Sequence, residues 1–151
     1  MKNKRILIVD DDKAILKSLK DILQSEGYGV DTAETGRGAI EKSEAQFYNL
    51  ALLDIKLLDM EGTKLLTKMH SDTPRMMKIM ITGYPSLENA VEALNLGADA
   101  YIMKPVSPEK LLEVVEDKLK EQEEAERMSE EKVAEWIESR VQKLERERHV
   151  K

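Results

Sequence analysis

The sequence contains no cysteine, which excludes disulfide bonds, zinc–thiolate sites and cysteine nucleophiles. Long apolar runs are also absent, and none approaches the roughly 20 residues that a membrane-spanning helix needs. The first residues, Met1–Lys4, lead directly into an apolar run and so do not form the pattern of a signal peptide. Together these absences favour a cytoplasmic protein that does not enter a membrane.

A net positive charge is missing as well, because 24 Lys and Arg face 30 Asp and Glu for a net charge of -6. Proteins that bind nucleic acid need a basic surface for the phosphates, so we expect no direct nucleic-acid contact. Much of the charge follows Lys118, in a stretch without Gly or Pro. A chain of 151 residues therefore predicts one domain, residues 1–120, followed by a charged helical tail, residues 121–151.

Strand-like and helix-like patterns alternate along residues 1–120. Short, largely apolar runs predict strands at residues 6–9, 50–53, 78–81 and 99–103, and residues 28–33 are interpreted as a further strand. Apolar residues at helical spacing predict helices at residues 13–26, 36–45, 61–70 and 86–96, and a fifth that begins at Pro108 after Ser107 as its N-cap. This alternation predicts an α/β fold with a doubly wound, five-stranded parallel sheet in the order 2-1-3-4-5.

Helix faces and helix ends follow from the same spacing. In the helix at 86–96 we expect Ala90, Val91 and Leu94 to face the core. Gly27 and Gly97 follow helical patterns, where a left-handed residue ends many helices.

The tail carries one apolar stripe. Ser129 is expected to cap a last helix, and four apolar residues follow at helical spacing: Val133, Ile137, Val141 and Leu144. The stripe covers about two heptads, fewer than the three or four that indicate a coiled coil. The sequence leaves open whether the tail dimerises, docks on its own domain, meets an effector or stays solvated.

Reactive residues follow four of the predicted strands. Asp10–Asp12 follow the first, Asp54 ends the third, and Thr82 and Lys104 follow the fourth and fifth. Parallel strands place these ends at one edge of the sheet. Clustered carboxylates repel one another unless a cation neutralises them, and Mg²⁺ prefers such oxygen ligands. The pattern indicates a magnesium-assisted phosphoryl-transfer site; whether the Lys104–Pro105 bond is cis stays open.

Asp54 is the expected nucleophile, because it ends an apolar strand and a carboxylate can form an aspartyl phosphate. The added negative charge needs compensation, which Lys104 and the hydroxyl of Thr82 would provide.

This ordered set of segments resembles the receiver domain of two-component response regulators. The resemblance covers about residues 4–120 and is carried by residues 6–12, 53–62, 80–83 and 97–105. It implies a flavodoxin-like fold and a stand-alone, chemotaxis-type receiver with a C-terminal helical extension.

The resemblance also implies the roles of the acidic residues. Asp54 accepts the phosphoryl group, Asp11 binds Mg²⁺ directly, and Asp10 helps to bind it. Lys56 contributes its backbone carbonyl to the metal. Asp12 continues the acidic run where the family accepts several residue types, and no ligand role is expected for it.

Three further roles follow from the resemblance. Thr82 binds a phosphoryl oxygen, Lys104 pairs with another, and Tyr101 is the switch aromatic that turns inward when the threonine moves. The chain departs from the family at Leu58, where proline is usual, so a looser loop is expected there.

The expected function is that of a phosphoacceptor in a phosphorelay, a signalling switch that catalyses only its own phosphorylation and slow dephosphorylation. Its partners would be a histidine kinase or phosphotransfer protein and an effector protein, with a homodimer through the 86–118 face or the tail as one form. Two alternatives stay open: a constitutive interaction module, and a haloacid-dehalogenase-like phosphatase with Asp10 as nucleophile.

Overall fold

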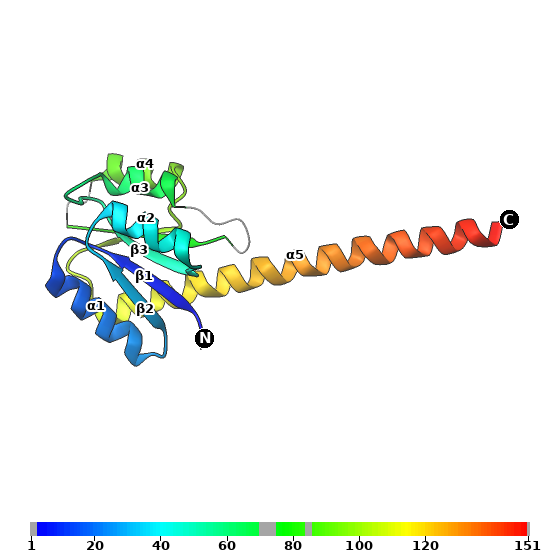
Figure 1. Cartoon of the computed structure of the whole chain (residues 1–151), viewed down its shortest axis with the longest axis horizontal. Helices are drawn as coiled ribbons and strands as arrows, with labels where there is room; N and C mark the ends of the chain where they lie inside the picture. Colours follow the sequence, from blue (N-terminus) through cyan, green and yellow to red (C-terminus); the bar gives the residue numbers. More distant parts are fainter. Residues whose placement is uncertain (1–2, 70–74, 84–85, 151) are drawn as a thin grey trace.

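The structure is a computed structural model that describes residues 3–69, 75–83 and 86–150 (Figure 1). Its strands are β1 Arg5–Val9, β2 Gly29–Ala33, β3 Leu50–Asp54, β4 Met77–Thr82 and β5 Ala100–Met103. Its helices are α1 Lys13–Ser25, α2 Gly36–Ala45, α3 Gly62–Lys68, α4 Leu87–Asn95 and α5 Pro108–Val150. All neighbouring strands are parallel, in the order β2-β1-β3-β4-β5, which confirms the predicted topology. The predicted end of the third helix, His70, lies outside the described residues.

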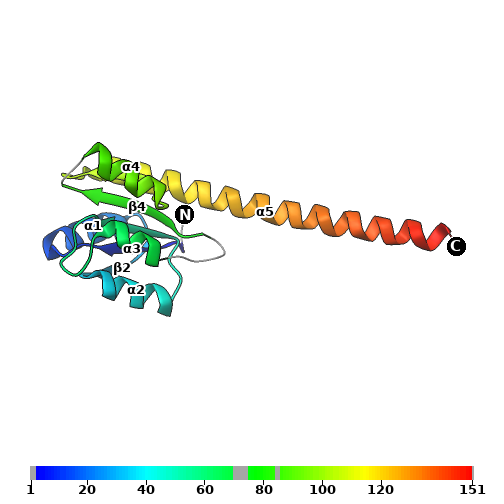
Figure 2. The same cartoon turned by 90° about the horizontal axis from the view of Figure 1, so that it is seen from above.

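Both faces of the sheet are covered (Figures 1 and 2). Helices α1 and α5 pack on one face, against Ile6 and Ile8 of β1. Helices α2, α3 and α4 pack on the other, against Leu7 and Val9. Burial on both sides explains why the central strands β1 and β3 carry continuous apolar runs, Ile6–Val9 and Leu50–Leu53, instead of alternating with polar residues.

Helix α4 turns a different face to the core from the one predicted. Ala93 is fully buried and Ala90 is half-buried, whereas Val91 and Leu94 are 48% and 52% exposed. Ala90 and Ala93 lie three residues apart on one side of the helix, and Val91 and Leu94 lie about 100° further round. The prediction was wrong for Val91 and Leu94, because the helix has two apolar faces and the one with small alanines packs on the sheet.

The expected helix ends are present. Gly27 and Gly97 have φ angles of +92° and +106°, in the left-handed region that favours glycine. The hydroxyl of Ser107 accepts a hydrogen bond from the Lys110 N–H at the start of α5. Asp12 is the N-cap of α1, because its carboxylate accepts hydrogen bonds from two N–H groups of the first turn.

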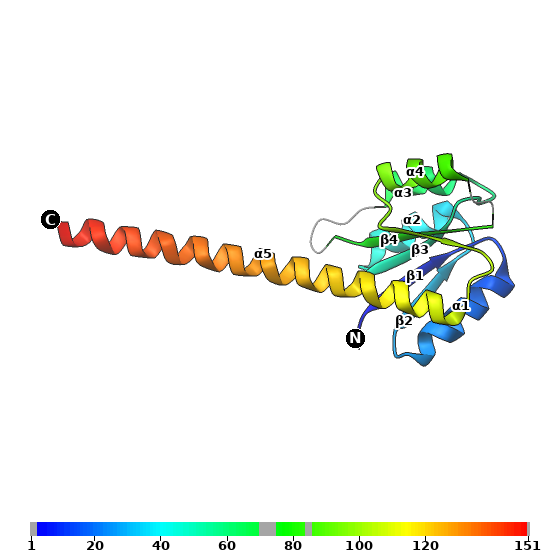
Figure 3. The ribbon, with the colours of Figure 1, turned by 180° about the vertical axis from the view of Figure 1, so that it is seen from behind.

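Helix α5 is continuous for 43 residues, so the prediction that Ser129 caps a separate last helix was wrong (Figure 3). The first part of α5 is anchored on the sheet by Leu111, Val115 and Leu119, which are fully buried. No Gly or Pro follows to interrupt the helix, and a helix already nucleated propagates through a serine at little cost.

Gln122 is the last residue of α5 that the domain buries, with 4% exposure. Its amide nitrogen donates to the backbone carbonyls of Asn49 and Arg75 at 2.8 and 2.7 Å. Its amide oxygen accepts from the side chain of Asn49 at 3.1 Å. These bonds hold α5 at the N-terminal ends of β3 and β4 and set the direction in which the helix leaves the domain. Within the described residues, α5 and the shorter helices all lack an apolar stretch long enough to cross a membrane.

Candidate functional site

The strand register brings the four sequence-distant strand ends together. Val9 of β1 pairs with Leu53 of β3, so Asp10 lies next to Asp54. Asp54 pairs with Ile81 of β4, and Thr82 pairs with Met103 of β5, directly before Lys104. The predicted convergence of these residues at one edge of the sheet is therefore present. The edge lies where the chain order of the strands reverses, between β1 and β3, the usual place for ligands in open α/β sheets.

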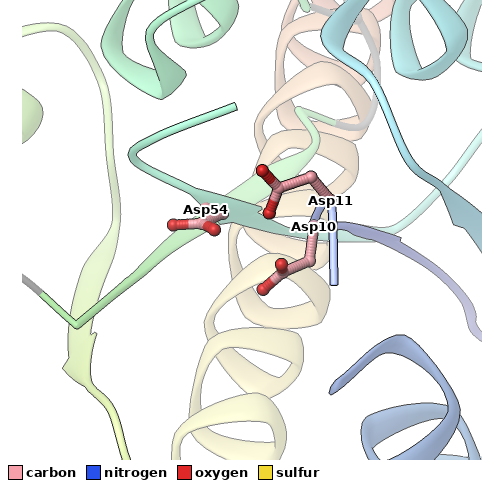
Figure 4. A group of neighbouring side chains, drawn as sticks. All are labelled: Asp10, Asp11 and Asp54. Atoms are coloured by element: carbon pink, nitrogen blue, oxygen red, sulfur yellow. The ribbon is translucent and has the colours of Figure 1, made fainter. Parts of the chain in front are cut away.

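Three carboxylates form the centre of this edge. One oxygen from each of Asp10, Asp11 and Asp54 lies within 4.8 Å of the others (Figure 4). Asp10 and Asp54 are 3% and 7% exposed, while Asp11 lies nearer the solvent. Hard oxygen donors at this separation fit a small divalent cation such as Mg²⁺, which keeps part of its water shell.

Lys104 provides the positive charge of the site. Its ammonium nitrogen lies 2.9 Å from Asp10 Oδ2 and 3.3 Å from Asp54 Oδ2. Partial burial opposes the charge of Lys104, but the hydrogen bond and charge of Asp10, with those of Asp54, outweigh burial and raise its pKa. Lys104 is therefore held as a cation between the two buried carboxylates. The peptide bond between Lys104 and Pro105 is cis.

The carboxyl group of Asp54 is less acidic than an ordinary aspartate. Burial raises its pKa, the charge of Asp10 raises it further, and Lys104 and the N–H of Lys56 oppose these effects only in part. The Lys56 N–H donates to Asp54 Oδ1 at 3.3 Å. In the absence of a bound cation, the negative charge of Asp54 is thus less stable in the folded protein than on an exposed aspartate.

The loop after β3 is tied to the site by close packing at Gly62. A Cβ atom at this position would lie 2.1 Å from the carbonyl oxygen of Asp54, so only glycine fits. The Gly62 N–H donates to the carbonyl of Ile55, which closes the loop next to Asp54.

Asp59 anchors the same loop from the other side, a role that the sequence analysis missed. Its two carboxylate oxygens accept hydrogen bonds from the N–H groups of Gly36 and Arg37 at 2.9 and 3.0 Å. These N–H groups belong to the first turn of α2, which favours negative charge. An acid in the loop five residues after Asp54 was visible in the sequence, but its partner 23 residues away was not. Leu58 in this loop is 85% exposed, and its side chain is not part of the carboxylate cluster.

Thr82 and Tyr101 lie deeper in the fold. Thr82 is fully buried at the end of β4, and its carbonyl accepts a hydrogen bond from the Lys104 N–H at 2.7 Å. The Tyr101 ring packs against the core on the α4 side. Its hydroxyl is buried and has no hydrogen-bond partner among the described residues. A polar group in this state loses solvation without compensation.

Fold and site together define a doubly wound α/β domain with a carboxylate–lysine cluster at the strand switch point. The chain belongs to the response regulator receiver domain family, whose model matches residues 6–116. The resemblance found in the sequence is thereby confirmed.

Individual proteins show the same relationship. A CheY-like receiver domain protein from Methanospirillum hungatei JF-1 is 62% identical, with a TM-score of 0.77 over 81% of this chain and 98% of its own. The alginate biosynthesis transcriptional regulatory protein AlgB of Pseudomonas aeruginosa PAO1 is 36% identical over 110 residues, 73% of this chain. The transcriptional regulatory protein ZraR of Escherichia coli K12 is 36% identical over 114 residues, 76% of this chain. The match spans only 24% and 26% of the lengths of AlgB and ZraR.

Proposed function

We propose that this protein is a phosphorylation-dependent switch of a two-component system, with Asp54 as the residue that accepts the phosphoryl group. The observation that carries the proposal is the meeting of Asp10, Asp11, Asp54 and Lys104 at one end of the sheet. Three carboxylates with one lysine leave excess negative charge for a divalent cation, and the lysine remains beside the acceptor. Receiver domains as a class are signalling switches, and membership of that family agrees with this role.

Mg²⁺ is the expected cofactor. Asp10, Asp11, Asp54 and the backbone carbonyl of Lys56 would hold it. When bound, it supplies positive charge that offsets both the carboxylates and the incoming phosphoryl oxygens.

The phosphoryl donor is the phosphohistidine of a histidine kinase or phosphotransfer protein. A carboxylate oxygen of Asp54 attacks the phosphorus in line with its bond to the histidine nitrogen. The new P–O bond forms as the P–N bond breaks, and the electron pair leaves with the nitrogen. Lys104 and the hydroxyl of Thr82 stabilise the phosphoryl oxygens. Hydrolysis of the acyl phosphate later resets the protein.

The donor protein would dock beside the site. An open, mainly apolar cavity of about 550 Å³ lies between α1 and the segment after β5. Its lining includes Lys104, whose ammonium nitrogen lies 3.3 Å from Asp54 Oδ2, so a protein seated there would lie beside the acceptor. The residues that line it are Ala14, Ile15, Ser18, Leu19, Lys104, Pro105 and Val106.

The output is a change in a protein-binding surface within residues 86–118. Thr82 and Tyr101 would connect the site to this surface. The buried hydroxyl of Tyr101 lacks a hydrogen-bond partner within the part of the chain that the structure describes, which favours a side chain with a second, solvated position. The surface exposes Val91, Leu94 and Met103 to about half, as an effector site would need. Phosphorylation needs to bias the two states by only a few kcal/mol to shift their populations.

Phosphorylation by a small-molecule donor tests this function directly. The full chain is incubated with phosphoramidate and Mg²⁺, and the modified residue is mapped by mass spectrometry of peptides. One phosphoryl group on Asp54, absent in Asp54→Asn and without Mg²⁺, is the expected result. Phosphate on Asp10 would instead support a phosphatase of the haloacid-dehalogenase type. If the protein never became phosphorylated, the remaining function would be that of a constitutive interaction module.

A further inference from the structure

The half of α5 beyond Gln122 carries an apolar stripe that the domain does not cover. The four stripe residues, Val133, Ile137, Val141 and Leu144, are 55%, 51%, 48% and 65% exposed. Figures 1 and 3 show this half of the helix leading away from the domain. Helices in proteins gain most of their stability by packing an apolar face against a partner.

The stripe lies on the same side of α5 as the domain. The residues of α5 that the domain buries recur at intervals of 4, 4 and 3, and so do those of the stripe. At 100° per residue, the mean directions of the two sets differ by only about 40°. The two sets are Leu111, Val115, Leu119 and Gln122, and Val133, Ile137, Val141 and Leu144.

This placement limits how a second helix can cover the stripe. A second α5 that ran parallel and in register would have to pass its own residues 108–122 through the space that the domain occupies. A helix that runs in the opposite direction carries its domain away, to the far end of the pair. The position of the domain therefore favours an antiparallel partner.

The charge distribution along the tail favours the same direction. Residues 121–131 contain six Glu and one Arg, whereas residues 140–148 contain four Lys or Arg and two Glu. Antiparallel pairing of two identical tails places the acidic part of each against the basic part of the other. Parallel pairing places like charges together, which costs free energy and disfavours that orientation.

We propose that the α5 tail pairs antiparallel with the tail of a second copy of this chain. Ile137 lies level with Val141 of the second copy, and Glu130 lies level with Arg148. The two domains then lie at opposite ends, with their Gln122 residues about 50 Å apart at 1.5 Å per residue. A contact of so few side chains is small, so the association is weak and reversible.

The mass of the full chain tests the pairing. Sedimentation between about 5 µM and 500 µM should show a rise from 17.2 kDa toward twice that mass. Ile137→Asp should keep the protein monomeric, whereas Ser139→Asp, the same new charge on the opposite side of the helix, should not. A monomer at every concentration would overturn the proposal, and so would an equal effect of both variants. A dimer that Ile137→Asp leaves intact but Val91→Asp abolishes would assign pairing to α4 and overturn it too.

The orientation has its own test, because the chain has no native cysteine to interfere. Glu130→Cys and Arg148→Cys are oxidised separately and as a mixture. Antiparallel pairing predicts that the mixture cross-links several times faster than either variant alone, and that the product joins the two variants. Faster cross-linking within each variant alone would show parallel pairing and overturn the proposal. Both tests use unphosphorylated protein, so their outcome is independent of phosphorylation at Asp54.

Discussion

The ammonium nitrogen of Lys104 lies 2.9 Å from the carboxylate of Asp10, although 94 positions separate the two residues in the chain. The same nitrogen reaches Asp54 at 3.3 Å, so one lysine joins the ends of β1, β3 and β5. A cation bound by the carboxylates would share them with this lysine. Lys104 and the metal are therefore expected to compete for the same carboxylates, so that each weakens the binding of the other, while both assist the phosphoryl transfer.

Lys104→Met separates these two effects. Without the ammonium group, repulsion of the metal disappears, so the affinity for Mg²⁺ in calorimetric titration should rise. The rate of phosphorylation of Asp54 by phosphoramidate should nevertheless fall by about tenfold or more, because a charge that stabilises the phosphoryl oxygens is lost. Lys110→Met, the same change at an exposed lysine of α5, should alter neither quantity. Unchanged Mg²⁺ affinity in Lys104→Met would contradict the competition.

Asp54→Asn is expected to stabilise the metal-free protein at neutral pH. The ordinary carboxyl pKa is 3.8, and burial with the charge of Asp10 raises the pKa of Asp54 in the folded state. Below pH 3.8 the group is protonated in both the folded and the unfolded state and costs nothing. Above pH 3.8 the unfolded state loses its proton first, so stability falls as pH rises, and the loss is complete once pH has passed the higher folded pKa. The Asn variant avoids that loss.

Urea unfolding in metal-free buffer measures this effect. The midpoint of Asp54→Asn should exceed that of the native protein at pH 7, and the difference should shrink toward pH 3.5. Added Mg²⁺ should also shrink it, because the native site, with all three carboxylates, binds the ion more tightly than the site of the variant and gains more stability from it. A variant less stable than the native protein at pH 7 without Mg²⁺ would show that the ion pair with Lys104 outweighs burial.

Gly62→Ala should damage the site and the fold together. The new Cβ would lie 2.1 Å from Asp54 O and 2.8 Å from Ile55 Cα, both backbone atoms that cannot move aside cheaply. The free energy of unfolding should fall by about 2 kcal/mol or more, as for other overpacked positions. Gly29→Ala is the control, because its Cβ would meet its nearest atom at an ordinary 3.7 Å. Equal stability of both variants would contradict the close approach.

Gln122→Ala should destabilise the domain and widen the range of directions in which α5 leaves it. The carbonyls of Asn49 and Arg75 would lose a donor in a buried place, at a cost of about 1–3 kcal/mol in unfolding free energy. Gln142→Ala, on the exposed part of the same helix, should cost less than about 0.5 kcal/mol. Spin labels on the domain and on the tail should show a broader distance distribution in Gln122→Ala alone. A distribution as narrow as that of Gln142→Ala would assign the direction of α5 to other contacts.

Much of the fold was predictable, because the central strands contain short apolar runs and the helix ends carry local sequence signals. Glycine after a helical pattern and Ser107 before Pro108 marked helix ends that the structure confirms. The candidate site was predictable for the same reason, since Asp10, Asp54 and Lys104 directly follow or end apolar runs. Their chemical roles stay predictions that phosphorylation and metal titration will test.

The errors occurred where two local patterns competed. Helix α4 has two apolar faces, and only the space above the sheet selected the one with Ala93 over the one with Leu94. Ser129 has the chemistry of an N-cap, yet the helix that starts at Pro108 was already formed and continued through it. The anchor at Asp59 was missed because its partners, the first N–H groups of α2, come from a distant part of the chain.

The sequence by itself determined the strands and the residues at their ends, because these depend on periodicity and on neighbours in the chain. The alternation of strands and helices, with the general rules for their connections, then predicted the parallel order. Only the tertiary structure decided how Lys104 bridges Asp10 and Asp54, how Gly62 and Asp59 hold the loop, and how Gln122 directs α5. Those features depend on distances between residues far apart in sequence. Such distances are set by packing of the whole core, and no local pattern records them.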